Sequence, residues 1–503
     1  MLRQFLSMNS LGLLLKDSPL GTRLAGGAFW SVLGAFTSRG IGLISWVLVG
    51  RLLGKEGFGE LGIVQSTVGM FGSIAGLGMG LAATKYVAEF RRSDPMRAGR
   101  VIAMASVLSW IGSAVLASLL AFFAHDLASQ TLAAPGLGYI LQWSSVLLFL
   151  SALAGTQSGA LTGFEAFRVQ SKINVISGLA SFPLLLGGAW LAGVWGAIWG
   201  LTAAAGLQAL LNWRALRDEC RRSDVQVQYS TCLSEISIVW KFNVPGLLNA
   251  LILAFVSWAG LAMIARLPGG IGEVGVFSAA LRMKQIPETL VAMVLAPILP
   301  ILSSAFSQND NDTCAKTLTF AYGVSSLIIL PIALVQTAAP ELTFILYGST
   351  FDGGTHIVPW LMLSAAAYAL FWPIGTIFVS MGRAWRALLI SILYVLLYLG
   401  LSLVLIPNYG AAGFAAAGAI AQILASLPCA YLLYAEFPDI MRATRWWQLL
   451  VGSVVAFSIC CLLSLYGNRL VAVVTGGFIA VAFVIWRIYH LTDFVGRSRI
   501  RHA

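Results

Sequence analysis

Runs of apolar residues long enough to cross a bilayer as helices, which takes about 20 residues, recur along this 503-residue chain. We predict about fourteen transmembrane helices, at residues 24–49, 60–83, 101–123, 139–161, 174–192, 194–212, 242–263, 276–305, 317–338, 358–381, 387–406, 412–434, 446–465 and 470–488. Charged residues make up only 10% of the chain, whereas soluble domains contain about 25%. The sequence therefore predicts an all-α integral membrane protein.

The basic residues are unevenly distributed over the predicted connections. If the N-terminus is cytoplasmic, the connections on that side carry 24 Lys and Arg residues, and the opposite side carries only Arg51, Lys55, Arg266 and Arg469. Because Lys and Arg concentrate on the cytoplasmic side, we predict a multi-pass protein of the cytoplasmic (inner) membrane with both termini in the cytoplasm. The net charge of +11 then reflects these connections and does not require a nucleic acid partner.

Two further patterns concern the N-terminus and the metal-binding residue types. Residues 1–23 contain a short apolar run without a small-residue cleavage site, which predicts an interfacial segment and not a signal peptide. The six cysteines include no C-x-x-C pair, and the four histidines form no H-E-x-x-H cluster. We therefore expect reduced thiols, no metal and no cofactor.

Gly57–Gly62 has the spelling G-x-G-x-x-G, which occurs in dinucleotide-binding folds. That motif requires a buried strand before it and a soluble βαβ unit around it. Here a membrane-length segment precedes the glycines and another follows them. We interpret the stretch as a tight turn, because glycine tolerates positive φ, and we expect it to begin the next helix.

The same spelling returns later in the chain at Gly270–Gly275. Two more pairs have similar spacing, Gly163 with Gly382 and Gly196 with Gly413. A near-constant offset of about 215 residues predicts two related halves, as in many transporters. The predicted organisation is an interfacial segment (1–23), an N-lobe of helices 1–6 (24–213), a cytoplasmic connection (214–241), a C-lobe of helices 7–12 (242–434), and helices 13–14 with a basic cytoplasmic tail (435–503).

The first predicted helix carries small and hydroxyl side chains on one face, with Arg39 at the edge of that face. The residues of this face are Ala28, Ser31, Ala35, Ser38, Gly42 and Ser45. Small residues favour close contact between membrane helices, which is one interpretation. The other is that the face borders a central cavity and that Arg39 points into it, because a charge at membrane depth needs a partner or water.

The eighth predicted helix concentrates polar residues in an arc of about 160°. They are Arg282, Lys284, Gln285, Glu288 and Thr289. Lys284 and Glu288 can pair at a spacing of four residues, so a buried salt-bridge network that only joins helices is one interpretation. The alternative is a cationic cavity lining formed by Arg282, Lys284 and Gln285, because arginine suits phosphate. Glu288 is then the candidate for proton or ion coupling.

The stretches Gly50–Gly59, Leu77–Gly80 and Ala83–Glu89 resemble the polysaccharide transporter family. This family is the oligosaccharide-lipid flippase branch of the multidrug/oligosaccharidyl-lipid/polysaccharide exporter superfamily. The resemblance covers most of the chain and is more specific in the first lobe. It implies two lobes in a V around a cationic cavity. It also implies flipping of undecaprenyl-diphosphate-linked oligosaccharide, a repeat unit of surface polysaccharide such as O-antigen or exopolysaccharide, by alternating access.

The partners implied by this resemblance are a lipid-linked oligosaccharide, membrane lipids, a proton or sodium ion for coupling, and polysaccharide polymerase machinery. Three other functions compete with it. A drug or cation exporter would carry acidic residues in the first lobe, where we place Arg39, and a peptidoglycan lipid-precursor flippase would share the cationic cavity. A membrane polysaccharide polymerase or ligase would need a large external loop with arginine. The longest one here, 339–357, has no Arg or Lys, so we expect no enzyme.

Overall fold

The computed structural model describes residues 19–76, 78–236, 244–295, 298–308, 310–381 and 383–438, with isolated positions at 457, 459, 478 and 479, and almost all of the side chains from residue 40 onward. Every regular element in these ranges is a helix or a helical turn, which confirms the all-α prediction. Apart from the isolated positions, the predicted helices 446–465 and 470–488 lie outside the described residues, as do residues 1–18 of the predicted interfacial segment.

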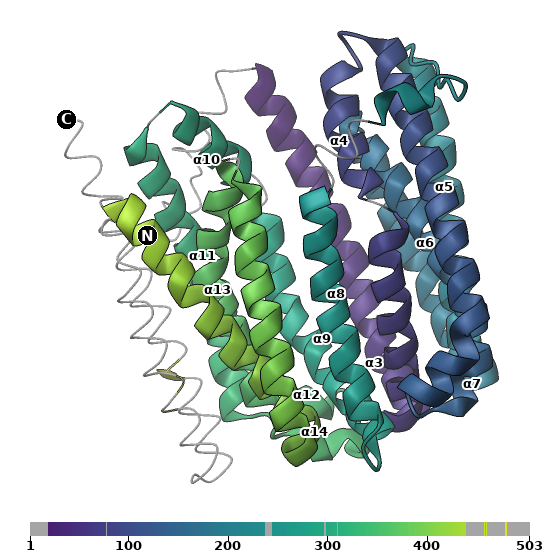
Figure 1. Ribbon diagram of the computed structural model, residues 1–503, viewed down its shortest axis with the longest axis vertical. Coiled ribbons are helices and arrows are strands. Elements are labelled where there is room, and N and C mark those ends of the chain that lie inside the picture. The colour runs from purple at the N-terminus through teal and green to yellow at the C-terminus, as the bar shows by residue number, and fades with distance from the viewer. Residues whose placement is uncertain are drawn as a thin grey trace. The chain divides into compact units, whose positions relative to one another are not determined.

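Most helices coincide with predicted apolar segments (Figure 1), but the predicted span 60–83 runs from α3 into α4, and the predicted span 276–305 runs from α9 into α10. They are α3 (Pro19–Ala75), α4 (Met79–Phe90), α5 (Pro95–Asp126), α6 (Gly138–Gly163), α7 (Phe167–Arg222), α8 (Val244–Ala265), α9 (Gly270–Leu295), α10 (Ile298–Ser307), α11 (Asn311–Ala338), α12 (Glu341–Ile345), α13 (Val358–Ser380) and α14 (Ala384–Glu436). Short turns connect some of them: η1 (Leu127–Thr131), η2 (Pro135–Leu137), η3 (Cys232–Glu235) and η5 (Ser349–Gly354).

Three of these helices, α3, α7 and α14, contain a non-helical break. α7 has 56 residues, and a straight helix of that length would span about 84 Å, far more than a bilayer core of about 30 Å. Its backbone leaves the helical region at Gly193 (φ 59°, ψ −136°), and a Cβ atom on Gly196 would lie 1.9 Å from the Gly188 carbonyl oxygen. α14 turns back in the same way at Gly410 (φ 53°, ψ −133°).

These reversals explain how the observed helices relate to the predicted spans. Seven described helices are long and apolar enough to cross a membrane, or eight if the bent pair α3 and α4 forms one span. α7 contains both predicted spans 174–192 and 194–212, and α14 contains both 387–406 and 412–434. The described helices are therefore consistent with the predicted number.

The turn expected at Gly57–Gly62 lies earlier in the chain. α3 breaks at Gly54, where φ is 67°, and the six residues of the motif are helical. The motif glycines serve close packing instead: a Cβ atom on Gly59 would lie 1.9 Å from the Ile271 carbonyl oxygen. The presence of a glycine does not show whether it adopts a positive φ or permits a close contact between backbones. For this reason the predicted position of the turn was wrong.

Backbone conformation confirms the internal repeat. Positive-φ positions in the first half recur in the second at nearly the predicted offset, as Gly54 with Gly269, Ala133 with Gly348, and Gly193 with Gly410. The predicted pair of Gly196 and Gly413 shares its environment too. Gly413 approaches the Leu405 carbonyl, just as Gly196 approaches the Gly188 carbonyl at the same separation along the chain. Gly382, of the remaining predicted pair, lies outside the described residues.

The described chain divides into two compact units. Unit 1 comprises residues up to Trp46, Phe71–His125 and Tyr139–Leu247; unit 2 comprises Val47–Met70, Asp126–Gly138 and the residues from Leu248 onward. Met79, Ile102, Leu161 and Ile173 belong to a core of unit 1 that joins α4, α5, α6 and α7. Bulky buried rings fill unit 2, among them Tyr322, Tyr347, Phe344, Phe378 and Phe414. The lobe boundaries predicted from the sequence stay a prediction.

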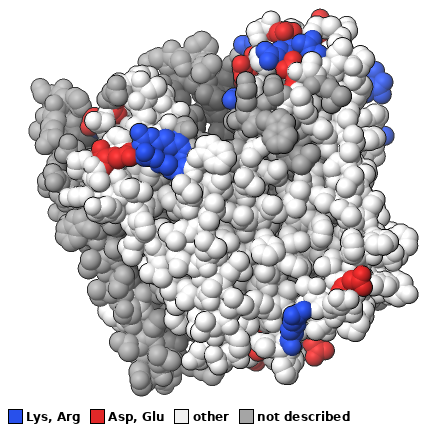
Figure 2. Space-filling view, viewed as in Figure 1, with Lys and Arg blue, Asp and Glu red and all other residues white. Residues whose placement is uncertain are grey.

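Charged side chains gather near helix ends in each unit. On the face shown in Figure 2, the surface over the middle of the helices consists of uncharged residues. In unit 1, Arg97 and Arg100 lie 3.2 and 3.4 Å from the Glu235 carboxylate. In unit 2, Asp310 precedes α11 and accepts hydrogen bonds from the Thr313 side chain and backbone, which lower the pKa of its carboxyl group. Uncharged middles and charged ends are typical of membrane-spanning helices.

The predicted orientation can be tested by labelling single cysteines in a cysteine-free background. Asp352 lies in the exposed turn η5, and Arg221 is exposed near the end of α7. Because the basic residues predict a cytoplasmic Arg221, we expect a membrane-impermeant thiol reagent to label Asp352→Cys in intact cells. Arg221→Cys should be labelled only after the membrane is permeabilised. The reverse pattern would invert the topology.

Candidate functional site

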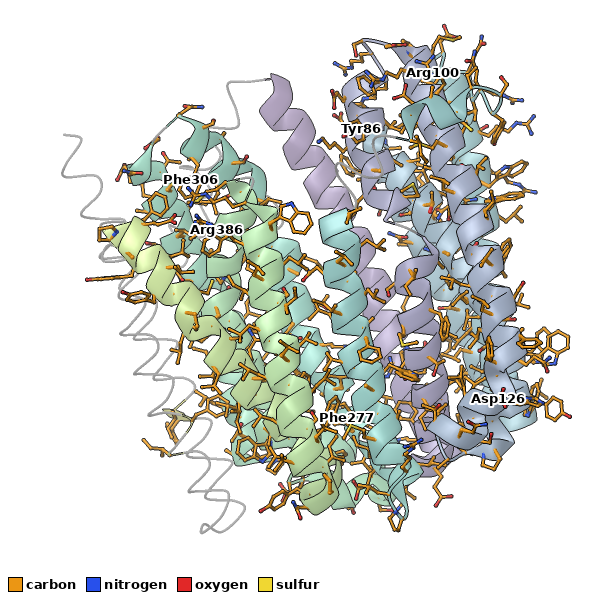
Figure 3. The ribbon with its side chains drawn as sticks, in the orientation of Figure 1. Tyr86, Arg100, Asp126, Phe277, Phe306 and Arg386 are labelled. Carbon is orange, nitrogen blue, oxygen red and sulfur yellow. The ribbon has the colours of Figure 1, made fainter. Side chains whose placement is uncertain are left out.

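The predicted polar arc lies on α9, in unit 2. Figure 3 labels Phe277 near the start of this helix, and Arg386 of α14 towards the other end of the unit. Arg282 donates from Nη2 to the Gln65 side-chain oxygen of α3 at 2.7 Å. Its guanidinium also lies over the Phe58 ring, 5.7 Å from the centroid. Two residues of α3 therefore orient the Arg282 side chain.

Lys284 and Glu288 lie on another side of α9. The Lys284 ammonium is 3.4 Å from the Glu288 carboxylate, and their side chains are 16% and 19% exposed. Lys284 also donates to the Ser364 hydroxyl of α13 at 3.0 Å. The spacing-based pair thus forms, and α13 contributes a third polar group that the sequence did not indicate.

Among the described side chains, Gln285 makes none of these contacts. Gln285 is exposed. Arg39 lies in α3, but its side chain is outside the described part of the structure. α9 continues as a helix through Pro287, although proline lacks a backbone donor. The structure brings together Lys284 and Glu288, and it directs Arg282 to a different helix; their roles in a cavity stay a prediction.

α3 and α9 cross at the start of the polar arc. A Cβ atom on Gly59 would lie 1.9 Å from the Ile271 carbonyl oxygen, and one on Gly275 would lie 1.9 Å from the Lys55 carbonyl oxygen. The crossing is reciprocal, because Gly59 is equivalent to Gly275 and Lys55 to Ile271 at one and the same offset between the halves. Only glycine permits backbones to approach this closely. Because α3 and α9 are held together at this crossing, Arg282 of α9 can reach Gln65 of α3 farther along the two helices.

A second reciprocal contact involves two arginines outside the arc. Arg51 donates from Nε to the Leu346 carbonyl at 2.5 Å and from Nη2 to the Ile345 carbonyl at 3.0 Å. Arg266 donates from Nε to the Thr131 carbonyl at 2.8 Å and from Nη2 to the Gln130 carbonyl. The two sets of hydrogen bonds are equivalent, because the donors and the acceptors of one set are separated from those of the other by the same number of residues. We call these four hydrogen bonds the arginine clamp.

The arginine clamp joins chain segments from both sequence halves within unit 2. In each case the guanidinium binds the carbonyls at the end of a short helical turn, where backbone acceptors lack partners. Sequence analysis assigned Arg51 and Arg266 only to external connections. The repeated Arg-Leu dipeptide before each glycine motif was the signal that could have identified them as an equivalent pair.

Comparisons with known proteins agree with this architecture. Residues 24–306, more than half of the chain, match the family described as polysaccharide biosynthesis protein. The succinoglycan biosynthesis transport protein ExoT of Rhizobium meliloti (strain 1021) is 23% identical over 343 residues. That match covers 67% of this chain and 65% of ExoT, so the chain spans slightly less than two thirds of this relative's length.

Solved structures share the fold at low identity. The inward-facing conformation of a multidrug resistance MATE family transporter has a TM-score of 0.65 at 16% identity, over 81% of this chain and 95% of the other. The lipid II flippase MurJ, inward closed, also gives 0.65 at 16% identity, over 93% and 99%. A MOP superfamily transporter from Pyrococcus furiosus gives 0.64 at 16%, over 86% and 98%. The chain therefore belongs to the polysaccharide biosynthesis protein family and is a multi-pass membrane protein with the fold of MOP superfamily transporters.

Proposed function

We propose that this protein flips undecaprenyl-diphosphate-linked oligosaccharide across the cytoplasmic membrane by alternating access. The observation that carries the proposal is Arg282, an arginine within the predicted span 276–305 whose side chain Gln65 and Phe58 orient. Gln65 is uncharged, so its hydrogen bond fixes the direction of the guanidinium without neutralising it. An oriented guanidinium can bind a phosphate through two charge-assisted hydrogen bonds.

The chemistry of the substrate fits this environment. A diphosphate head group needs cations at membrane depth, where an uncompensated charge costs several kcal/mol. Arg282, Lys284 and Gln285 on α9, and Arg39 on α3, are the residues that we propose for it. The prenyl tail can stay in the lipid while the sugar crosses. The relative ExoT carries the name of a succinoglycan transport protein, which supports an exopolysaccharide repeat unit as the cargo.

The arginine clamp and the glycine crossing support alternating access. Both lie in the part of unit 2 that the basic residues predict to be external, and both join segments from the two halves of the sequence. Hydrogen bonds between a guanidinium and backbone carbonyls can break and re-form without any covalent change. We propose that they hold the external end closed while the substrate enters from the cytoplasm.

A deletion strain tests the proposed cargo. If the protein is the flippase, lipid-linked repeat units should accumulate in the cytoplasmic leaflet, inaccessible to an added glycosidase, and a plasmid copy should restore the surface polysaccharide. A polymerase would instead leave single repeat units exposed outside. Accumulation of the peptidoglycan lipid precursor with cell lysis would assign the protein to that pathway and overturn the proposal.

Glu288 is the proposed coupling residue, because it is an acid within a predicted span and pairs with Lys284. If a proton or sodium ion binds there, Glu288→Gln should abolish gradient-driven transport in proteoliposomes, since the amide neither titrates nor attracts a cation. Ser364→Ala is a matched control: it removes the neutral contact to Lys284 and should keep the ion dependence. If transport by Glu288→Gln still responds to pH or sodium, the coupling role is wrong and the Lys284–Glu288 ion pair is a static contact.

A further inference from the structure

Unit 1 contains a groove of about 640 Å³ that the proposed transport does not use. It lies between α5, α6 and the last turns of α7, and residues 225–229 border one end. Its volume falls within the range of small-molecule sites, about 300–1,000 Å³. α5 begins, and α6 and α7 end, at the side that the basic residues predict to be cytoplasmic. Figure 3 labels Arg100 at this end of α5.

The deep part of the groove is apolar and open to the surrounding membrane. Leu153 and Leu216 line it from α6 and α7, and both are buried. Trp110 and Trp213 also line it, yet they are 58% and 48% exposed. A wall of this kind suits a hydrocarbon chain, which needs no polar partner and gains from leaving water.

The shallow part carries positive charge. Arg217 and Arg221 line the groove one helical turn apart on α7, and both are exposed. Arg217 lies 5.8 Å from the centroid of the Trp213 ring. Among the described residues neither arginine forms an ion pair, whereas Arg222 on the same turn pairs with Glu219. Two neighbouring guanidinium groups at a membrane interface match a lipid phosphate.

The groove also contains a buried acceptor. The side-chain oxygen of Gln157 lines the groove without a hydrogen-bond partner among the described residues. Its neighbours Ser109 and Thr156 bond to each other at 2.9 Å. A buried acceptor without a partner is destabilising, and a ligand hydroxyl group would satisfy it. Tyr229, 62% exposed at the mouth, is a residue type typical of membrane interfaces.

We propose that this groove binds an anionic phospholipid of the cytoplasmic leaflet with a hydroxylated head group. The phosphate binds Arg217 and Arg221, a head-group hydroxyl donates to Gln157, and one acyl chain lies along the apolar wall past Trp213 and Trp110. The site is separate from the α9 arc, so it can stand even if the proposed cargo is wrong.

Native mass spectrometry of the full-length protein with phosphatidylglycerol tests the site. The double variant Arg217→Gln, Arg221→Gln should bind phosphatidylglycerol about tenfold more weakly than the wild type, because it loses two charge-assisted contacts. The matched control Arg214→Gln, Arg222→Gln removes the same charge from the same helix end without touching the groove, and should bind within about twofold of the wild type. If both double variants lost affinity for phosphatidylglycerol equally, the loss would be due to net charge alone, and the proposal would be overturned.

Three further ligands distinguish the possible occupants. Glycerol 3-phosphate has the head group without the chain, and strong competition by it would show a site for free phosphate only. Undecaprenyl phosphate lacks the head-group hydroxyl, and much tighter binding of it than of phosphatidylglycerol would assign the groove to the carrier lipid. Strong competition by glycerol 3-phosphate or tighter binding of undecaprenyl phosphate would each reject a phospholipid as the occupant. Phosphatidylethanol, a phosphodiester of the same single charge without the head-group hydroxyl, should bind more weakly than phosphatidylglycerol, and Gln157→Leu should remove that difference. A difference unchanged in Gln157→Leu would contradict the hydroxyl contact.

Discussion

Replacing Arg282 by alanine is expected to lower the flipping of lipid-linked oligosaccharide while the protein still inserts and accumulates normally. Under the proposed function, the lost contact is a charge-assisted hydrogen bond to phosphate, whose removal costs about 1.5–3 kcal/mol, or roughly ten- to a hundredfold in affinity. Arg39→Ala should have an effect of the same size if its side chain faces the same cavity. Surface polysaccharide output, divided by membrane abundance, measures the defect in a complemented deletion strain.

Further variants separate a substrate contact from helix packing. Arg282→Lys keeps the charge but loses the forked geometry, so it should restore flipping only in part. Gln65→Ala keeps the arginine and removes its orienting contact, so it should give an intermediate defect. The control Arg386→Ala breaks an exposed ion pair with Glu436 at a helix end and should leave the output unchanged. If Arg282 served packing alone, abundance would fall while the output per molecule stayed normal. Full output from an Arg39→Ala, Arg282→Ala double variant at normal abundance would remove both residues from the site.

The helices and the repeat could be predicted because both depend on short-range properties of the chain. An apolar run of membrane length forms a helix in lipid whatever surrounds it. Gly193 and Gly410 take up matching conformations because each starts a reversal between two such runs. The turn in α3 was predicted at Gly57–Gly62 and lies at Gly54. All these turn candidates are glycines, and only the packing of Gly59 against α9 shows that it serves a close contact.

The candidate site was predictable only as a set of residues on one helix. Arg282 and Lys284 lie at opposite ends of the polar arc, so different neighbours meet them. That those neighbours are Gln65 of α3 and Ser364 of α13 depends on how distant segments pack. Periodicity along one helix contains no such information.

The arginine clamp was missed for a related reason. A charge count treats Arg51 and Arg266 as loop residues that report topology. Their acceptors are backbone carbonyls at Gln130–Thr131 and Ile345–Leu346, and carbonyls exist at every residue, so no residue type marks them. The repeated Arg-Leu dipeptide indicates that the two arginines are equivalent. Their shared type of contact becomes visible only from the matching offset of donors and acceptors, once the contacts are known.

Removing both arginines of the clamp is expected to open the predicted external end of unit 2. Each arginine makes two hydrogen bonds to carbonyls, and both side chains are exposed, so we assign only about 1–1.5 kcal/mol to each. Together they should shift the closed–open equilibrium by about 30- to 150-fold. Thr343, a buried residue of α12 that is 1% exposed, provides the probe as Thr343→Cys in a cysteine-free background.

In the double variant Arg51→Ala, Arg266→Ala, an impermeant thiol reagent should label Thr343→Cys faster by about that factor. Each single variant should give part of the effect, because the two halves of the clamp oppose the same opening. Glu56→Gln is the matched control, since it changes the charge of the same segment of α3 at an exposed position without taking a donor from the clamp. Its labelling rate should equal that of the parent protein. Transport should fall in the double variant, because a transporter that stays open outside does not reload from the cytoplasm. An unchanged labelling rate in the double variant would mean that the glycine crossing alone keeps this end closed.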